Sequence, residues 1–263
     1  MSSSPTRVKR ERRSVTFVLL LLFCLFTGVF FFLRSPYFHI REFRVEGLGR
    51  VSREEILARC GQDSPSIFAF DTEKAEDLIE LCPWIQMAEV WRELPGTVAV
   101  RVTERTPVAF MPVGDDLWLI DAEARVLGKD DGTWTGLVAL TGPEVSATPG
   151  QFLDAGTYGW GLKALATMGP VAREKLTEIS IQAGEASLIL DDGCRVLLGK
   201  DTGDIARKAA ALDSVLRDLH DEGKIAERID LRFEKVAIKL RLIEPLDHVT
   251  GGTLTKDDDS EAR

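Results

Sequence analysis

The sequence predicts an α+β protein that begins with one N-terminal transmembrane helix and continues into two folded domains of different design. Three observations support this prediction. They are a long uncharged apolar run near the N-terminus, a strand-helix-helix-strand-strand pattern after it, and a series of short strand-like runs in the second half. With 44% hydrophobic and 29% charged residues among 263, the chain has the composition of folded domains rather than of a disordered protein.

The apolar run extends from Val15 to Leu33 and contains no charged residue. A helix of this length, at about 1.5 Å per residue, spans the hydrocarbon core of a bilayer. Residues 1–14 carry five Lys or Arg against one Glu, whereas only Arg34 is charged among the six residues after the run. The positive-inside rule therefore predicts a basic cytoplasmic tail, 1–14, and an outer location for the main body. A cleaved signal peptide is disfavoured, because the run is long and no small-residue cleavage site follows it.

Residues 34–106 are predicted to form a β-α-α-β-β domain. The first predicted helix opens with the capping box Ser52-Arg-Glu-Glu55, and the second begins at Asp71 and ends before Pro83. A turn at Leu94-Pro95-Gly96 joins the last two strands into a hairpin. The predicted strands of this domain are residues 37–48, 85–91 and 97–102.

Residues 107–244 are predicted to form a β-rich domain, with an antiparallel sheet flanked by helices. Gly- and Asp-rich turns separate its short apolar runs, and helices are predicted at 158–168 and 204–219, the second of which has an apolar face at helical spacing. Residues 245–263 read as a polar tail. The predicted strands are residues 108–111, 117–120, 125–127, 137–140, 176–182, 186–190, 195–198, 229–233 and 236–242.

Motifs with specific spacing occur in both predicted domains. In the first domain the motifs are Phe38-x-Ile40-x-x-Phe43-x-Val45-x-Gly47, Pro83-Trp84-Ile85-x-x-Ala88-x-Val90, Leu94-Pro95-x-Thr97-Val98 and Val102-x-Glu104-Arg105-x-Pro107-Val108-Ala109. In the second they are Val138-x-Leu140-Thr141-Gly142, Leu197-Leu198-Gly199-Lys200, Lys208 and Ile229-Asp230-Leu231-Arg232-Phe233. These motifs resemble the FtsQ/DivIB family of bacterial cell-division proteins, whose first outer domain is a POTRA domain. The resemblance covers about residues 15–244.

This resemblance implies a non-enzymatic scaffold of the division septum that links early and late divisome proteins. It implies a single-pass type II protein of the inner membrane, with periplasmic main domains that gather at midcell during division. The implied partners are FtsB- and FtsL-type bitopic proteins, with FtsK-, FtsW- and FtsI-type proteins as further candidates. The alternative function is that of an envelope-assembly or secretion POTRA protein, which would bind unfolded β-strands.

The end of the second domain is the most informative part for function. The apolar period of Ile229, Leu231 and Phe233, all expected to point inward, changes phase before Val236, which predicts a bulge or a tight turn at Glu234-Lys235. No further element follows, so the last strand is expected at a sheet edge, either open to an incoming strand or covered by a loop or the tail.

The residues alone leave both alternatives for this edge standing, and the family resemblance favours a binding edge. The implied contact is with FtsB and FtsL, in which Arg232 would meet a carboxylate and Phe233 an apolar pocket. The predicted partner-binding residues are Arg232, Phe233, Val236, Ala237, Ile238, Lys239 and Leu240.

Signatures of catalysis are missing from the sequence, so no catalytic residue, metal or cofactor is predicted. The three histidines have no HExxH spacing, the four cysteines form no CxxC pair, and there is no GxSxG elbow. Gly159-x-Gly161-x-x-Ala164 matches a dinucleotide fingerprint by letters only, without a strand running into it. The acidic pairs suit turns, although a glycosidase pair stays open as an alternative. A disulfide between Cys60 and Cys82 also stays open, and the acidic main body makes nucleic-acid binding unexpected.

Overall fold

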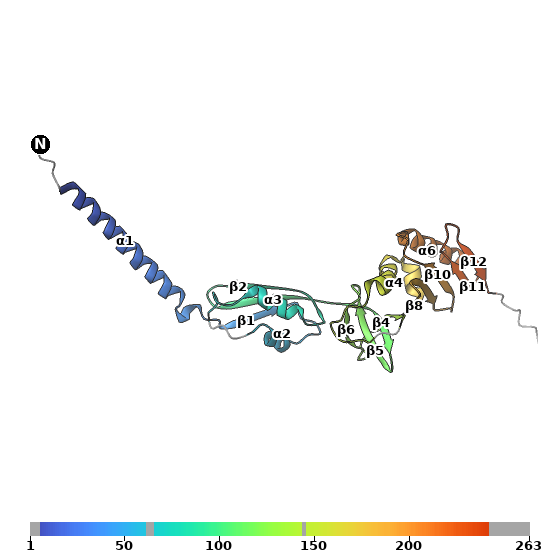
Figure 1. Ribbon diagram of the computed structural model, residues 1–263. Coiled ribbons are helices and arrows are strands. Elements are labelled where there is room, and N and C mark those ends of the chain that lie inside the picture. The colour runs from blue at the N-terminus through green and yellow to red at the C-terminus, as the bar shows by residue number, and fades with distance from the viewer. Residues whose placement is uncertain (1–5, 62–65, 144–145, 242–263) are drawn as a thin grey trace, which may run out of the picture.

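The computed structural model describes residues 6–61, 66–143 and 146–241, with side chains described from residue 17 onward. Helix α1 (Thr6–Leu33) leads into a domain built on a three-stranded sheet, and a domain built on a nine-stranded sheet follows it (Figure 1). Helix α1 and the last strand therefore lie at opposite ends of the molecule. Among the residues whose side chains are described, no helix is both long and apolar enough to cross a membrane. The predicted span begins at Val15, outside that part.

The first domain has the predicted β-α-α-β-β order. Its sheet has the order β1-β3-β2, with β1 parallel and β2 antiparallel to the central strand β3. A short 3-10 helix, η1 (Pro36–Phe38), occupies the start of the predicted first strand, because the Ser35 side chain caps it by accepting the Tyr37 N–H. The elements are β1 (Glu42–Glu46), α2 (Arg53–Arg59), α3 (Thr72–Glu80), β2 (Ile85–Glu93) and β3 (Thr97–Glu104).

Both predicted helix starts in this domain are confirmed. The Ser52 hydroxyl accepts the Glu55 N–H at 3.2 Å, and the Asp71 carboxylate accepts the Lys74 N–H at 3.1 Å, so each cap satisfies a donor that the first helical turn leaves free. The other half of the capping box is replaced, because the Glu55 carboxylate accepts from Arg59 instead. The caps direct the apolar faces of α2 and α3 onto one side of the sheet.

The second domain differs from the predicted antiparallel sheet, because its nine strands form a mixed sheet. Three pairs are parallel: β4 with β7, β7 with β8, and β10 with β11. Two of these pairs join strands that are separated along the chain by helices, as parallel neighbours require. The elements are β4 (Pro107–Val113), β5 (Asp116–Asp121), β6 (Val126–Lys129), β7 (Val138–Thr141), α4 (Ala155–Thr167), α5 (Pro170–Lys175), β8 (Leu176–Gln182), β9 (Glu185–Leu190), β10 (Arg195–Gly199), α6 (Ile205–Asp221), β11 (Ala226–Asp230) and β12 (Ala237–Leu240).

Helices α4 and α6 contribute to the core of the second domain, and the dinucleotide-like motif lies inside α4. A Cβ at Gly161 would come within 2.9 Å of Ile179 and 3.0 Å of Ile181 on β8. The glycine therefore allows close packing of helix on sheet rather than contact with a phosphate. The resemblance of this motif to a dinucleotide fingerprint is therefore explained by helix-sheet packing.

The junction between the two domains is held by charged and aromatic side chains. Only two residues separate β3 from β4, and one of them, Arg105, is buried. Its guanidinium pairs with Asp121 at 2.6 Å and with Glu123 at 2.7 Å. Beside it, the Trp84 ring stacks on Trp134 with a centroid distance of 6.4 Å. These contacts place the free end of the nine-stranded sheet away from α1 (Figure 1).

Candidate partner-binding edge

The last two strands form a hairpin at one end of the nine-stranded sheet. Strand β12 pairs antiparallel with β11, and Ile238 lies opposite Ile229 in the register. Residues 232–235 form the bend between the strands. Of the two geometries predicted at Glu234-Lys235, the structure therefore has a turn, and a single bulge lies in β11 near Glu227 instead.

Phe233 does not point inward as the alternation predicted. Its side chain is 64% exposed, whereas Ile229 and Leu231 are buried. The reason is that the strand geometry ends at Leu231, whose N–H donates to the Leu197 carbonyl, and Phe233 lies in the turn beyond it. A period of two applies only while the backbone stays extended.

The apolar side chains of β12 continue the core face of the sheet beyond the last covered strand. Residues directly opposite each other in an antiparallel pair share a face, so Ile238 lies on the face of the buried Ile229. Leu240 lies opposite the buried Ala226 in the same way. Yet Ile238 and Leu240 are each 42% exposed, because the core of this domain ends here. Val236, the residue just before β12, packs partly against the core.

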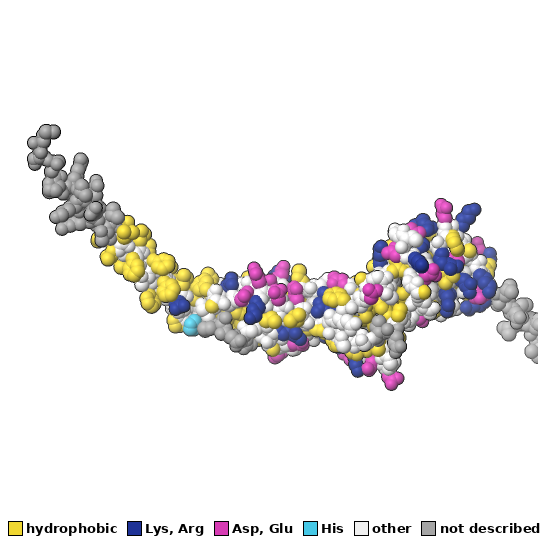
Figure 2. Space-filling view, in the orientation of Figure 1, with side chains coloured by type: hydrophobic (Ala, Val, Ile, Leu, Met, Phe, Trp, Pro, Cys, Tyr) yellow, Lys and Arg dark blue, Asp and Glu magenta, His cyan; other side chains and the backbone are white. Residues whose placement is uncertain are grey.

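Charged side chains surround this apolar strip. Residues 226–241 carry five Lys or Arg against three Asp or Glu, in a chain with a net charge of -9. Figure 2 shows basic side chains gathered over the hairpin end of the molecule. The edge is therefore locally cationic on an acidic protein.

Two of the predicted site residues are already held by acidic neighbours that the sequence did not single out as partners. Arg232 makes a two-pronged contact with Asp230, at 2.7 Å for the shorter ion pair, which lowers the pKa of that carboxyl. Lys239 reaches across the hairpin to Glu227 at 2.7 Å, and its hydrogen bond lowers the pKa of Glu227. The first pair holds the start of the turn and the second joins the two strands, and both leave the cations at the surface.

The other end of the nine-stranded sheet is covered by its own chain. The N–H of Val126 in β6 donates to the Gln151 carbonyl, and the Gly150 N–H donates back to Val126, both at 2.8 Å. By contrast, none of the described residues hydrogen-bonds to the outer side of β12. Leu242 and the predicted tail lie outside the described residues.

The outer strand of the first domain, β2, is closed by side chains. Helix α3 places two carboxylates one helical turn apart beside it. Glu80 accepts the Ala88 N–H at 3.0 Å, and Glu76 accepts the Val90 N–H at 2.7 Å. Among the described residues, β2 and β6 are therefore covered on their outer sides and β12 is not; the fourth sheet-end strand, β1, also has no main-chain bond on its outer side, but it lacks the exposed apolar strip of β12.

A hollow of about 340 Å³ lies beside the start of β11 and was not expected from the sequence. Its apolar wall comes from the end of α6 and from Ile225, whose carbonyl accepts the Arg241 N–H just after β12. The hollow is therefore a neighbour of the exposed strip. In the sequence, the hollow is marked only by an Ile that follows the helix-ending Gly223. That pattern is too common to predict a hollow.

Groups that could perform chemistry are dispersed. Within the described ranges, no three His, Cys, Asp or Glu side chains are grouped to hold a metal ion. His39 bridges to Ser66, His220 lies at the end of α6, and His248 lies outside the described residues. Cys60 and Cys82 are free thiols in the structure, and burial raises the pKa of Cys60 to about 11, so it is unreactive.

Comparison with protein families gives two matches. Residues 38–105 match the model described as POTRA domain, FtsQ-type, and residues 109–232 match Cell division protein FtsQ/DivIB, C-terminal. The second match ends at Arg232, so Phe233 and β12 lie beyond it.

Curated relatives agree with these matches. Cell division protein FtsQ of Myxococcus fulvus is 28% identical over 233 residues, which cover 84% of this chain and 80% of the relative. The protein of the same name from Anaeromyxobacter sp. is 30% identical over 205 residues, covering 75% of this chain and 69% of the relative. The protein of that name from Rhizobium meliloti is 29% identical over 204 residues, which cover 75% of this chain and 61% of the relative.

Proposed function

Because this chain belongs to the FtsQ/DivIB family of cell-division proteins, we propose that it is a septal scaffold that recruits partners by adding their strands to β12. FtsQ is a non-enzymatic division protein, so its function is to bind partners rather than to catalyse a reaction. The observation that carries the proposal is a sheet-end strand with a free outer side among the described residues and exposed apolar side chains beside it. Such an edge accepts an incoming strand through main-chain hydrogen bonds.

The partners we propose are the FtsB- and FtsL-type bitopic proteins. A strand laid along β12 would bury Ile238 and Leu240, and Phe233 at the turn would enter an apolar pocket of the partner. The cationic surroundings of the edge favour a partner segment with acidic residues. Because Arg232 is already paired with Asp230, a partner carboxylate would join an existing ion pair. Lys239 would do the same from its pair with Glu227.

FtsQ proteins are division-site membrane proteins. We propose that residues 15–33 span the inner membrane once, with residues 1–14 in the cytoplasm and both domains in the periplasm. In support, the described large apolar side chains between Phe17 and Leu33 are exposed, which water disfavours and lipid does not. Anchoring in the membrane raises the effective concentration of the edge for partners tethered beside it.

The envelope-assembly alternative is less well supported by the first domain. A POTRA domain that handles unfolded strands needs an open sheet edge of its own. Here one of the two sheet edges, the outer side of β2, is occupied at two positions by Glu76 and Glu80, which leaves β1 as the other edge. A fluorescent fusion separates the alternatives, because a midcell ring is expected for a division scaffold and a uniform envelope signal for the alternative.

Two proline substitutions test the edge. Successive residues of a strand point their N–H groups to opposite sides, so one of Ala237→Pro and Ile238→Pro removes a donor from the free side and the other removes one that faces β11. The Arg241 N–H donates to Ile225, so by alternation the Ala237 N–H faces β11 and the Ile238 N–H faces the free side. We expect at least a tenfold loss of affinity for the FtsB/FtsL pair in Ile238→Pro, from lost main-chain bonds and a disturbed strand. Affinity is measured with the full chain and the pair in nanodiscs.

Ile238→Val is the matched control, because it keeps the N–H and the β-branched shape, and less than a twofold change is expected. Circular dichroism and melting temperature establish that each variant is folded. If both proline variants fold and bind within twofold of the unaltered chain, strand addition at β12 is wrong.

A further inference from the structure

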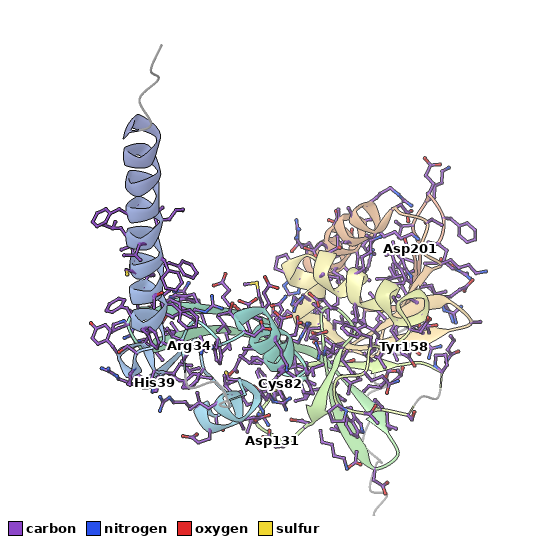
Figure 3. The ribbon with its side chains drawn as sticks, turned by 60° about the vertical axis from the view of Figure 1, so that its left-hand side comes forward. Arg34, His39, Cys82, Asp131, Tyr158 and Asp201 are labelled. Carbon is purple, nitrogen blue, oxygen red and sulfur yellow. The ribbon has the colours of Figure 1, made fainter. Side chains whose placement is uncertain are left out.

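Three segments of the first domain gather at the exit of α1. Helix η1 follows α1 directly, and the turn at residues 66–70 is fastened to it by the Ile67 N–H, which donates to the Phe38 carbonyl at 2.9 Å. The turn between β2 and β3 is fastened by the Arg41 N–H, which donates to the Gly96 carbonyl at 2.8 Å. Figure 3 shows Arg34 and His39 at this base of the helix. This end of the domain is therefore built from turns held close to α1.

Each of these segments exposes one large apolar side chain. Tyr37 is 53% exposed, Phe68 44% and Leu94 61%. Phe68 is not a loose side chain, because its neighbour Ile67 is fully buried and anchors the turn in the core. We call Tyr37, Phe68 and Leu94 the proximal rim. Exposed apolar groups held in place around one point mark an interaction surface.

Aromatic contacts connect the rim to the end of α1. The Phe68 ring lies 5.0 Å from the Phe38 ring, which lies 5.3 Å from Phe32 near the end of the proposed span. These two ring-to-ring distances are comparable with the thickness of the interfacial layer of a bilayer, which is on the order of 5 to 8 Å on each side. Phe68 is therefore within reach of the headgroup region wherever Phe32 lies at the edge of the hydrocarbon.

The charges at this place also suit a lipid surface. Between Arg34 and Arg41 the chain has no acidic residue. The Arg34 guanidinium lies 4.9 Å from the Phe30 ring centre, and that of Arg41 lies 5.8 Å from the Tyr37 ring centre. Aromatic side chains with a cationic side chain beside them anchor proteins at the membrane-water interface. Figure 2 shows the hydrophobic surface of α1 reaching the start of this domain, with basic side chains at the transition.

We propose that the proximal rim inserts into the outer headgroup layer of the membrane, with anionic phospholipid as the ligand of Arg34 and Arg41. The proposal rests on the proposed span of residues 15–33. The rim holds the first domain against the bilayer and thereby limits the directions in which β12, at the far end, can point. The partner of this surface is the bilayer itself, and the first domain is a lipid-contacting module as well as a spacer.

Spin labels on the full chain in nanodiscs of phosphatidylethanolamine and phosphatidylglycerol test this proposal. Cys24→Ala leaves three buried thiols, so a label attaches selectively at Phe68→Cys. The matched control is Met87→Cys, which is similarly exposed at 48% but lies six residues along β2 from Glu93, roughly 20 Å away at the strand rise. We expect the label at position 68 to be at least threefold less accessible than that at position 87 to a water-soluble nickel chelate, and more accessible to oxygen.

A third label at Phe26→Cys separates the two proposals. If position 26 lies in the bilayer and position 68 relaxes like position 87, the rim inference is overturned and the proposed span stands. If position 26 is exposed to the nickel chelate, the span fails and the rim inference fails with it. Replacing phosphatidylglycerol by phosphatidylcholine is expected to raise the accessibility of position 68 to the chelate, since the anionic ligand of the arginines is removed.

Discussion

The outer strands β2 and β12 pose the same physical problem, and the protein treats them differently. An outer strand leaves main-chain donors and acceptors without a sheet partner. At β2, Glu76 and Glu80 on α3 take the two N–H groups of Val90 and Ala88. At β12, no described residue fills that place, and the side chains beside it are apolar.

The difference shows that this protein can close an outer strand with its own side chains or chain segments. Two glutamates at helical spacing are enough to occupy β2, and the chain segment at Gly150-Gln151 is enough to cover β6. We infer that β12 is left accessible for use. The junction at Arg105 matters to this comparison, because it holds the closed edge and the free edge in separate, fixed domains.

The largest expected effect comes from the junction. Arg105→Ala leaves the buried Asp121 carboxylate without its cation, and removing one partner of a buried ion pair costs about 3 kcal/mol or more. We expect the free energy of unfolding to fall by about 3 kcal/mol. Binding at β12 should change less than twofold, because the edge is distant. Denaturation of the full chain, followed by the summed fluorescence of its five tryptophans, measures the first quantity.

Arg44→Ala is the matched control for this prediction. Its ion pair with Glu93 has nearly the same length, 2.7 Å, but both side chains are at least a third exposed. Screening by water makes such a pair worth about 1 kcal/mol at most. Equal losses of stability in Arg44→Ala and Arg105→Ala would contradict the claim that the junction is locked by a buried charge.

The next largest effect is expected at the closed edge. Replacing Glu76 and Glu80 together by Ala leaves two buried N–H groups without acceptors, at a cost of about 1 to 3 kcal/mol each before water enters. We expect unfolding free energy to fall by about 2 kcal/mol. Hydrogen exchange of the Ala88 and Val90 amides should accelerate more than that of Val98 in the central strand.

Replacing both glutamates by Gln separates hydrogen bonding from charge. The amide oxygen can still accept the strand N–H, so exchange at Ala88 and Val90 is expected to stay much slower than in the Ala variant. Unchanged exchange in the Ala variant would mean that the carboxylates do not close the edge, and the contrast with β12 would lose its basis.

Local features of both domains could be predicted from the sequence because short-range physics determines them. The helix starts at Ser52 and Asp71 could be predicted because a hydroxyl or carboxylate acceptor precedes an apolar face at helical spacing. The β-α-α-β-β order followed from these helix starts and from the strand patterns around them. The parallel pairing of β10 with β11 could not be predicted, because strand direction depends on how α6 returns the chain across the sheet.

The candidate site was predicted in part for the same reason. The change of phase before Val236 located the hairpin, but alternation beyond Leu231 placed Phe233 inside when the turn puts it outside. The ion pairs of Arg232 and Lys239 were missed for different reasons. Asp230 lies two residues before Arg232, and the alternation of a strand does not predict that these two side chains meet at the turn. Glu227 can be placed next to Lys239 only when the hairpin register is known.

The smallest expected effect concerns pH at the free edge. The Lys239 hydrogen bond holds the pKa of Glu227 below its ordinary value of 4.5, so this pair stabilises the hairpin above that value and loses its effect as the pH falls through the lowered pKa. In Lys239→Ala, the pKa of Glu227 is expected to rise toward 4.5, measured by NMR titration of labelled carboxyl carbons. Asp230 is the internal control, because Arg232 still lowers its pKa in that variant. A Glu227 pKa that ignores the loss of Lys239 would show that the pair is not formed in solution, and that β12 is held to β11 by its main-chain bonds alone.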